Sequence, residues 1–461
     1  MPDRANAVSA STTDDKPIAS YDDLLSLFHA AVKPAGEFRV GAEMEKFGVF
    51  ADGTPVPYDG EHGVLAIMQE LAATQGWRPE AETEGGPIIA LYRDGASITL
   101  EPGSQFELSG APLLSCHEIC AELRGHIAEI TPFSERAGIR WLGLGFHPFA
   151  KREDYTMVPK QRYAIMREYL PTRGSLALDM MLRTSTVQAN YDFSSEDDAM
   201  TKMRVGLKLA PLTTAMFANS PFYEGAPFGG KSYRAKVWLD TDPDRSGLVP
   251  TLWKKTARFV DYVEWALDVP MFMFKRDGQK MVNTGQSFRS FFKSGFSGHK
   301  PTMTDWQTHL NTLFPEVRLK KTIEVRGADA QGATLACALP ALYTGLFYDA
   351  KALSEVEALT ADWTLDEVTG SRKEVWQKGL GARFRAGTLQ PLAEKVIEIA
   401  EGGLERRGFT SSSGKDERVH LATLKELVAQ GRSPADRLLD GIEHARDMRA
   451  EIIARSELSA G

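Results

Sequence analysis

The segment Phe38 to Glu45 limits the fold more than any other, because polar and apolar side chains alternate along it. In an extended strand successive side chains point to opposite faces, so Glu43 and Glu45 share one face above an apolar underside. Two neighbouring carboxylates repel each other, and a bound divalent cation allows both to stay ionised. Taken alone, the segment is better explained as an ordinary half-exposed strand with two solvated acids.

The same pattern recurs in two later segments. A predicted hairpin ends at Glu101, and after the Pro-Gly break that follows it, Glu107 lies on the polar face of residues 105–109. In residues 321–327 alternation places Glu324 and Arg326 on one face and apolar side chains on the other. Taken alone, the first segment is better explained as a polar-faced hairpin, and the alternative for the second is a cross-strand ion pair, which contributes little at an exposed position.

Residues 181–191 are predicted to form one strand with an unusually polar face. Thr184, Thr186, Gln188 and Asn190 share that face, which is typical of the lining of a site. Arg183 has the opposite parity, so it would reach the same site only through a bulge or a bend.

Together the acids form a ligand set that contains only oxygen donors. Its members are Glu43, Glu45, Glu107 and Glu324, with Glu101 and Gln188 as further candidates. Hard oxygen ligands suit Mg²⁺ or Mn²⁺, and no nearby His or Cys favours zinc. Carboxylates on a sheet beside arginines indicate a site where magnesium holds phosphates and arginines neutralise charge. The residues therefore predict ATP- and Mg²⁺-dependent phosphoryl transfer and leave the acceptor undefined.

The composition is that of a globular protein, with 43% hydrophobic and 25% charged residues among 461. A formal net charge of -8 argues against nucleic acid or an anionic membrane as a partner. Three cysteines without CxxC spacing favour a reducing, cytoplasmic location. The polar start lacks the apolar region of a signal peptide, and we expect residues 1–19 to form a disordered tail.

Two nucleotide-binding motifs are rejected. Residues 225–232 match the P-loop pattern, but that loop needs a buried strand before it and a helix starting at Lys231. Asn219-Ser220-Pro221 comes before the motif, and residues 233–239 look like a strand. Gly143 and Gly145 begin a dinucleotide-binding fingerprint that Pro148 interrupts.

Several long strings resemble glutamate–cysteine ligase of the plant and proteobacterial type, among them VGAEMEKFGVF, LEPGSQFELSGAPL, LDMMLRTSTVQANYDFSSE and FPEVRLKKTIEVRGAD. The resemblance implies an α+β, glutamine synthetase-like catalytic fold. In that fold a curved, mainly antiparallel sheet forms a funnel, with helices outside it. The catalytic core is then expected over residues 20–350, and a helical C-terminal region packed on that core over 351–461.

The resemblance also implies the chemistry. ATP would phosphorylate the γ-carboxylate of L-glutamate, and the amine of L-cysteine would displace phosphate to give γ-glutamylcysteine, the first step of glutathione biosynthesis. Glu43, Glu45, Glu107 and Glu324 match metal-ligand acids of the family. Gln188 stands where more distant ligases carry a histidine ligand, and Glu101 is carried over as a further ligand. Arg234 and Arg326 match positions expected to meet the phosphates, and Arg183 matches a substrate-facing arginine. We also expect Lys160, in a basic stretch, to contact the nucleotide.

Some positions depart from the plant pattern. Plant members carry a cysteine pair on a hairpin near Asn283 and residues 294–299, and this chain has none there. Cys120 and Cys337 match a second plant pair, so either a disulfide or a buried thiol fits Cys120.

Three alternatives stay open at this stage. The first is a related carboxylate–amine ligase that uses another amine, and the second is a metal- and nucleotide-binding protein without turnover. The third is a kinase that acts through Lys231. The expected partners are small molecules, and the expected assembly is a monomer or a homodimer.

Overall fold

The computed structural model describes residues 16–276 and 279–459. Most of the expected N-terminal tail, residues 1–15, lies outside the described residues. The remainder of that segment packs on the protein: Pro17 pairs with Thr302, and the buried Ile18 donates its amide to the carbonyl of Pro301 at 3.0 Å. The packed chain therefore begins before residue 20.

A nine-stranded sheet forms the centre of the molecule, and all of its pairings are antiparallel. In spatial order its strands are β14 (Val317–Leu319), β15 (Ile323–Asp329), β7 (Thr186–Tyr191), β1 (Val40–Val49), β5 (Phe106–Ser109), β4 (Ala96–Leu100), β3 (Ile88–Arg93) and β2 (Arg78–Ala81), with β6 (Arg140–Leu142) also paired to β1. The expected hairpin before Glu101 is confirmed as β3 and β4. The α+β class is confirmed as well.

Helices surround this sheet. In chain order they are α1 (Tyr21–His29), α2 (Val64–Thr74), α3 (Cys116–Ala137), α4 (Gln161–Tyr169), α5 (Ala177–Arg183), α6 (Glu196–Met216), α7 (Tyr233–Trp238), α8 (Phe259–Asp268), α9 (Phe288–Ser294), α10 (Met303–Leu310), α11 (Ala333–Ala336), α12 (Ala338–Phe347), α13 (Ala350–Leu359), α14 (Leu365–Lys378), α15 (Leu389–Arg407), α16 (Ala422–Ala429), α17 (Pro434–Leu439) and α18 (Met448–Ser456). No described helix is long and apolar enough to cross a membrane.

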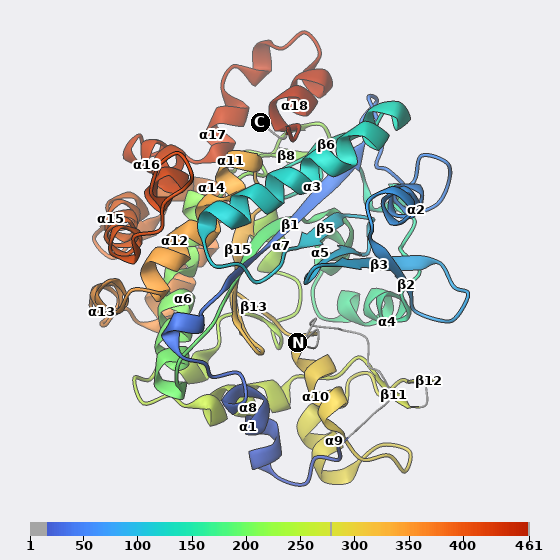
Figure 1. Cartoon of the computed structure of the whole chain (residues 1–461), viewed down its shortest axis with the longest axis vertical. Coiled ribbons are helices and arrows are strands. Elements are labelled where there is room, and N and C mark those ends of the chain that lie inside the picture. Colours follow the sequence, from blue (N-terminus) through green and yellow to red (C-terminus); the bar gives the residue numbers. More distant parts are fainter. Residues whose placement is uncertain (1–15, 277–278, 460–461) are drawn as a thin grey trace.

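Three helices cover the apolar face of the sheet. α3 packs on β1, α12 packs on β7 and α6 packs on β15, and Figure 1 shows α3 running along β1. The buried ring of Tyr191 on β7 contacts the rings of Tyr343 and Phe347 on α12. These contacts leave the other face of the strands for polar side chains.

The C-terminal helices share the same hydrophobic core. One cluster of buried apolar side chains extends from Ile18 to Leu458. Within it α15 packs on α12 and α14 packs on α6. Cys120 of α3 and Cys337, between α11 and α12, are joined by a disulfide, while Cys116 is a buried free thiol.

The expected strand over residues 181–191 is wrong in its first part. Helix α5 continues to Arg183, and β7 begins only at Thr186. The helix is stabilised because Asp179 and Arg183 pair one turn apart, and the hydroxyl of Thr184 donates to the carbonyl of Met180 at 2.6 Å. Thr184 therefore does not belong to the polar face of the strand.

The expected strand over residues 233–239 is also wrong. Ser232 caps helix α7 by accepting the amide of Ala235, and this cap outweighs the strand propensity of the segment. A helix does follow Lys231, so one reason for rejecting the P-loop fails. The rejection still holds, because the amides of Lys231 and Ser232 donate to the carbonyl of Trp376.

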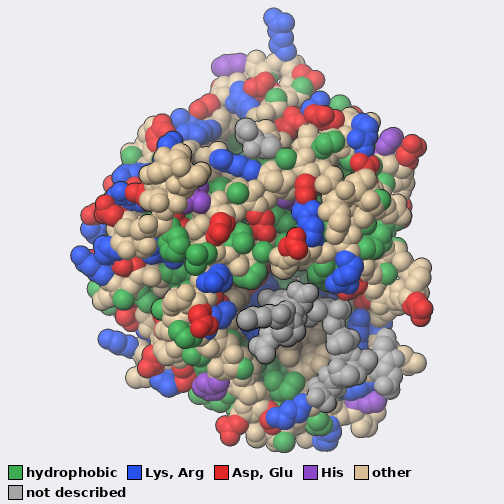
Figure 2. Space-filling model, in the orientation of Figure 1, with side chains coloured by type: hydrophobic (Ala, Val, Ile, Leu, Met, Phe, Trp, Pro, Cys, Tyr) green, Lys and Arg blue, Asp and Glu red, His purple; other side chains and the backbone are tan. Residues whose placement is uncertain are grey.

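The visible surface carries charges of both signs. Figure 2 shows basic and acidic side chains interspersed over that face, without a broad basic patch among the described residues.

Candidate active site

The strand register brings the predicted acids onto one face of the sheet. β1 lies between β5 and β7, so Glu45 lies opposite Glu107 and Glu43 lies opposite Gln188. On the next strand Glu324 lies opposite Asn190. Residues from four separated segments are thus assembled by antiparallel pairing, as the alternation predicted.

Neutral donors hold three of these carboxylates in place. Asn190 donates its side-chain amide to Glu43 at 2.8 Å, and the backbone amide of Thr186 donates to Glu45 at 3.0 Å. The hydroxyl of Thr99 donates to Glu107 at 2.6 Å. These bonds orient the carboxylates without neutralising them.

Burial and mutual repulsion disfavour the charged forms of three acids. Burial raises the pKa of Glu43, and the carboxylates of Glu324 and Glu107 raise it further. Burial and the nearby Glu107 and Glu101 raise the pKa of Glu45 well above its usual value. Burial and Glu107 also raise the pKa of Glu101. A divalent cation would relieve this repulsion, so the donor set fits the predicted metal.

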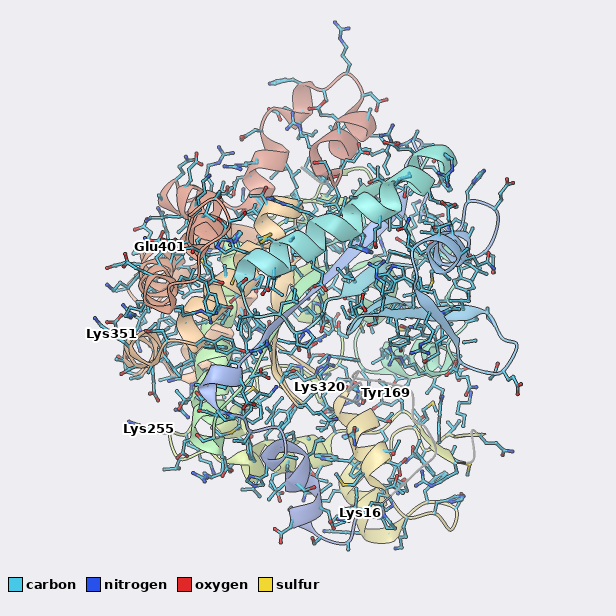
Figure 3. All side chains as sticks on the ribbon, in the orientation of Figure 1. Lys16, Tyr169, Lys255, Lys320, Lys351 and Glu401 are labelled. Carbon is cyan, nitrogen blue, oxygen red and sulfur yellow. A yellow bond between two sulfur atoms is a disulfide. The ribbon has the colours of Figure 1, made fainter. Side chains whose placement is uncertain are left out.

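Glu324 is in the opposite electrostatic state. Its two oxygens accept hydrogen bonds from Arg318 at 2.5 and 2.9 Å, while Arg326 lies 3.2 Å and Lys320 3.5 Å away. Burial alone would raise the pKa of Glu324, but these three cations outweigh burial and lower it. In the view of Figure 3, Lys320 lies near the middle, whereas Lys255, Lys351 and Glu401 lie toward one edge.

A bulge in β15 shapes the arginine side of the site. The pairing of β15 with β7 shifts between Val325 and Ala328, so two residues oppose one partner there. Arg326, within the bulge, donates to the side-chain oxygen of Gln188 at 2.6 Å. Beyond the bulge Asp329 pairs with Thr186 and therefore lies on the same face as Glu324.

Asp329 then positions the segment that carries Arg234. Its carboxylate accepts hydrogen bonds from the hydroxyls of Ser220 and Ser232, at 2.7 and 2.9 Å. Arg234 donates to the carbonyl of Arg326 at 2.9 Å, so the two predicted arginines are neighbours. Gly145 leaves room for this carboxylate, because a Cβ there would lie 2.3 Å from a side-chain carbon of Asp329. The interrupted glycine motif thus has a packing role.

Lys160 lies on the Glu101 side of the cluster. Its ammonium group donates to the carbonyl of Leu100 at 2.8 Å. Burial, together with the nearby Arg162, lowers the pKa of Lys160 to about 8, although Glu101 and Glu107 oppose this shift. The residue is close enough to the acids to influence their charge.

Arg183 forms a separate part of the site region. Its guanidinium lies between the rings of Phe146 and Tyr223, 4.6 and 4.8 Å from their centres. Asp179 pairs with it at 3.1 Å and Glu224 at 3.6 Å. Its Nε and Nη2 atoms are buried and have no hydrogen-bond partner among the described residues.

Sequence reasoning missed three charged residues of the site. Arg318 and Lys320 lie on or just after the short edge strand β14, whose three residues give no usable alternation. Asp329 has the parity of the apolar face, and only the bulge returns it to the polar face. A surplus of basic residues in the string VRLKK was the only available signal for the first two.

The architecture is an all-antiparallel sheet with helices on one face and clustered acids and arginines on the other. The architecture resembles the crystal structure of glutamate–cysteine ligase from Francisella tularensis in complex with AMP, with a TM-score of 0.57. That match covers 91% of this chain and 87% of the other, at 12% identity, and concerns the fold.

Sequence comparison identifies the family. Residues 39–456 match the model of glutamate-cysteine ligase family 2. The chain is 44% identical over 435 residues to the chloroplastic glutamate–cysteine ligase of Medicago truncatula, covering 93% of this chain and 84% of the relative. It is 44% identical over 423 residues to that of Arabidopsis thaliana, covering 91% and 79%. The chain therefore belongs to glutamate-cysteine ligase family 2 and is a ligase.

The expected cytoplasmic location is corrected by these relatives. The Medicago and Arabidopsis proteins, and those of Brassica juncea and Oryza sativa, are all described as chloroplastic. Composition and cysteine count do not distinguish two compartments that both lack an oxidising secretory environment, so the cytoplasmic assignment had no firm physical basis.

Proposed function

We propose that this protein uses ATP to join the γ-carboxylate of L-glutamate to the amine of L-cysteine, giving γ-glutamylcysteine. A carboxylate is a poor electrophile until one of its oxygens becomes part of a phosphate leaving group. Phosphoryl transfer from ATP would give γ-glutamyl phosphate and ADP. The amine would then attack the acyl carbon and release phosphate. The observation that carries the proposal is the acid cluster on the polar sheet face, in a chain 44% identical to glutamate–cysteine ligases.

We assign the divalent cations to this acid cluster. Glu43, Glu45 and Glu107 supply carboxylates that are oriented by neutral donors, and Glu101 and Gln188 complete the oxygen set. Mg²⁺ or Mn²⁺ bound there would neutralise phosphate oxygens of ATP. Glu324 would become a ligand only by sharing an oxygen now paired with Arg318 or Arg326.

The arginines would perform two tasks. Arg326 and Arg234 line one pocket together with Trp238, and their charges would stabilise the phosphoryl group as it transfers. Lys160 is assigned to the nucleotide on the opposite side of the cluster. Arg183, with two buried N–H groups lacking hydrogen-bond partners, is suited to hold a substrate carboxylate.

Phosphate release with L-glutamate and a panel of amines tests the specific reaction. L-cysteine should give the highest kcat/KM, and mass spectrometry should detect γ-glutamylcysteine in the same amount as the phosphate. L-serine and L-alanine serve as acceptors close to L-cysteine in size, and ammonia serves as a much smaller one. Faster phosphate release with another amine would instead support the alternative, a related ligase with a different acceptor.

A further inference from the structure

A second cluster of metal-binding side chains lies on the helix-covered side of the sheet, away from the acids. It joins α3, the junction of α11 and α12, and the 3-10 turn Glu417–Leu421. Its members are Cys120, Cys337, His420 and His117. None of them contributes to the chemistry assigned to the acid cluster.

The ligand atoms of this cluster lie close enough to converge on one zinc ion once the disulfide is opened. Nδ1 of His420 lies 3.3 Å from Sγ of Cys120. The two sulfur atoms and a ring nitrogen of His420 all lie within 4.8 Å of one another. With Zn–S and Zn–N bonds of about 2.3 and 2.0 Å, tetrahedral ligand atoms lie about 3.5 to 3.8 Å apart. The side chains would need only small movements to share one ion.

His117 is placed to orient His420. Nε2 of His420 lies 3.0 Å from Nδ1 of His117, and both residues are half-buried. A proton on Nε2 of His420, donated to His117, leaves the Nδ1 lone pair directed toward the cysteines. Histidines that bind metals are commonly held in this way through their second nitrogen.

We propose that, when Cys120 and Cys337 are reduced, their thiolates and His420 bind one Zn²⁺ ion, with His117 as a positioning residue. The disulfide must first be opened by a reductant. A phosphine supplies two electrons and becomes the phosphine oxide, with its oxygen taken from water, while the two protons of that water go to the sulfurs. Zinc binding then releases both thiol protons. The buried thiols supply soft ligands, and the half-buried histidines border solvent.

Cobalt spectroscopy of the full chain tests this proposal. The protein is reduced with a phosphine and supplied with excess Mg²⁺, so that the carboxylate cluster does not take up cobalt. One equivalent of Co²⁺ should then give a sulfur-to-cobalt charge-transfer band and tetrahedral d–d bands. Zn²⁺ should displace the cobalt and remove both signals. Protein oxidised until only one thiol titrates should give no charge-transfer band.

Single substitutions identify the ligands. Cys337→Ser should abolish the charge-transfer band, and His420→Ala should weaken Co²⁺ binding by at least about tenfold. Cys116→Ala removes the neighbouring buried cysteine and serves as the matched control, with an unchanged spectrum. The proposal is overturned if the reduced wild type shows no charge-transfer band, or if Cys337→Ser and His420→Ala retain it at full affinity.

Alkylation of the wild type gives an answer that does not depend on the folding of any variant. Zn²⁺ should slow iodoacetamide labelling of Cys120 and Cys337 by at least about tenfold, as measured on their peptides by mass spectrometry. Labelling of Cys116 should be unaffected by zinc. Equal labelling of all three cysteines with and without zinc would contradict the site.

Discussion

Glu43 and Glu324 show how position alone gives two identical side chains opposite properties. Both lie on the polar face of the central sheet. Glu324 is surrounded by Arg318, Lys320 and Arg326, which hold its pKa low. Glu43 forms no ion pair within residues 16–276 and 279–459, and its pKa is raised. The carboxylate of Glu324 is already neutralised by the protein, whereas that of Glu43 is suited to an added cation.

Glu45→Gln should separate activity from stability. Removing this charge should lower kcat/KM for γ-glutamylcysteine formation by about 100-fold or more, comparable to the loss of one electrostatic group at an active site. The free energy of unfolding without metal should stay equal or increase, because Glu45 is buried beside Glu107 and Glu101. Coupled phosphate assays and urea unfolding measure the two quantities.

Glu61→Gln is the matched control for that substitution. Glu61 is exposed in the loop after β1, so the variant should retain wild-type kcat/KM and stability. Wild-type activity in Glu45→Gln would remove the case for a metal at this acid cluster.

Lys231→Ala tests whether the accidental P-loop pattern has any role. The ammonium group of Lys231 pairs with Asp436 at 2.5 Å, and both side chains are partly exposed. The substitution should cost less than about 1 kcal/mol of stability and change kcat less than about twofold. A large increase in KM for ATP, measured by initial rates, would instead support nucleotide binding by this lysine.

The identity of the acids could be predicted at this scale, but their charge states could not. Alternation along 38–45, 105–109 and 321–327 correctly placed the carboxylates on one face. The pairing of Glu324 with Arg318 depends on contact between neighbouring strands, which a single segment does not reveal.

At the scale of elements, the predictions failed where a helix end, a helix cap or a bulge overrode the polar and apolar pattern of the sequence. The polar alternation of residues 184–190 suggested an early strand, yet α5 continues to Arg183. Ser232 supplies an N-cap that starts α7 where strand-forming residues follow. The β15 bulge leaves no mark in the hydrophobic pattern, and it alone brings Asp329 to the polar face. The type of an element could be predicted where the alternation was long, but the residues at which elements begin and end could not be predicted.

His309 on α10 should make the fold sensitive to acid. Its Nε2 hydrogen-bonds the carbonyl of Ala266 on α8 at 2.8 Å, and burial lowers its pKa to about 3. Below pH 6.5 the unfolded chain therefore binds a proton at this residue that the folded chain does not bind. Stability from His309 is fully present above pH 6.5 and decreases as the pH falls toward 3.

His309→Phe should remove this dependence. The variant loses one hydrogen bond, so it should be less stable than wild type at pH 7. From pH 7 to pH 5 the difference between the two unfolding free energies should shift in favour of the variant by about 2 kcal/mol. Urea unfolding at both pH values measures this shift, and the substitution His444→Phe at an exposed position serves as the control. A constant difference would mean that His309 titrates normally in the folded protein.

At the scale of the whole molecule, one continuous core connects the sheet and the C-terminal helices. Helices α12 and α15 approach so closely that a Cβ on Gly403 would lie 1.9 Å from the carbonyl oxygen of Gly345. We propose on this basis that residues 351–461 do not fold independently of residues 20–350. The resemblance predicted a helical region packed on the core, but it did not indicate backbone contact between these helices.

Gly403→Ala and Gly402→Ala form a matched pair on α15. The atoms nearest to a Cβ at Gly402 belong to the flexible side chain of Arg406, so Gly402→Ala should stabilise the protein by up to about 1 kcal/mol. Gly403→Ala should destabilise it by about 1 to 3 kcal/mol, because backbone must move. Thermal and urea unfolding should show one transition for each protein. Equal effects of the two substitutions would contradict the close crossing.

The bulge in β15 also has a consequence for the kinds of sequence change that this enzyme tolerates. Conservative replacements before and after Gly327 leave the count of residues unchanged, so Glu324 and Asp329 keep the same face. Deletion of Gly327 would restore regular pairing and leave Asp329 opposite Thr186, because Arg326 alone would then oppose Gln188, so Asp329 would keep its contacts with Ser220 and Ser232. The strand can therefore lose the extra residue of the bulge without displacing Asp329 or the segment that carries Arg234.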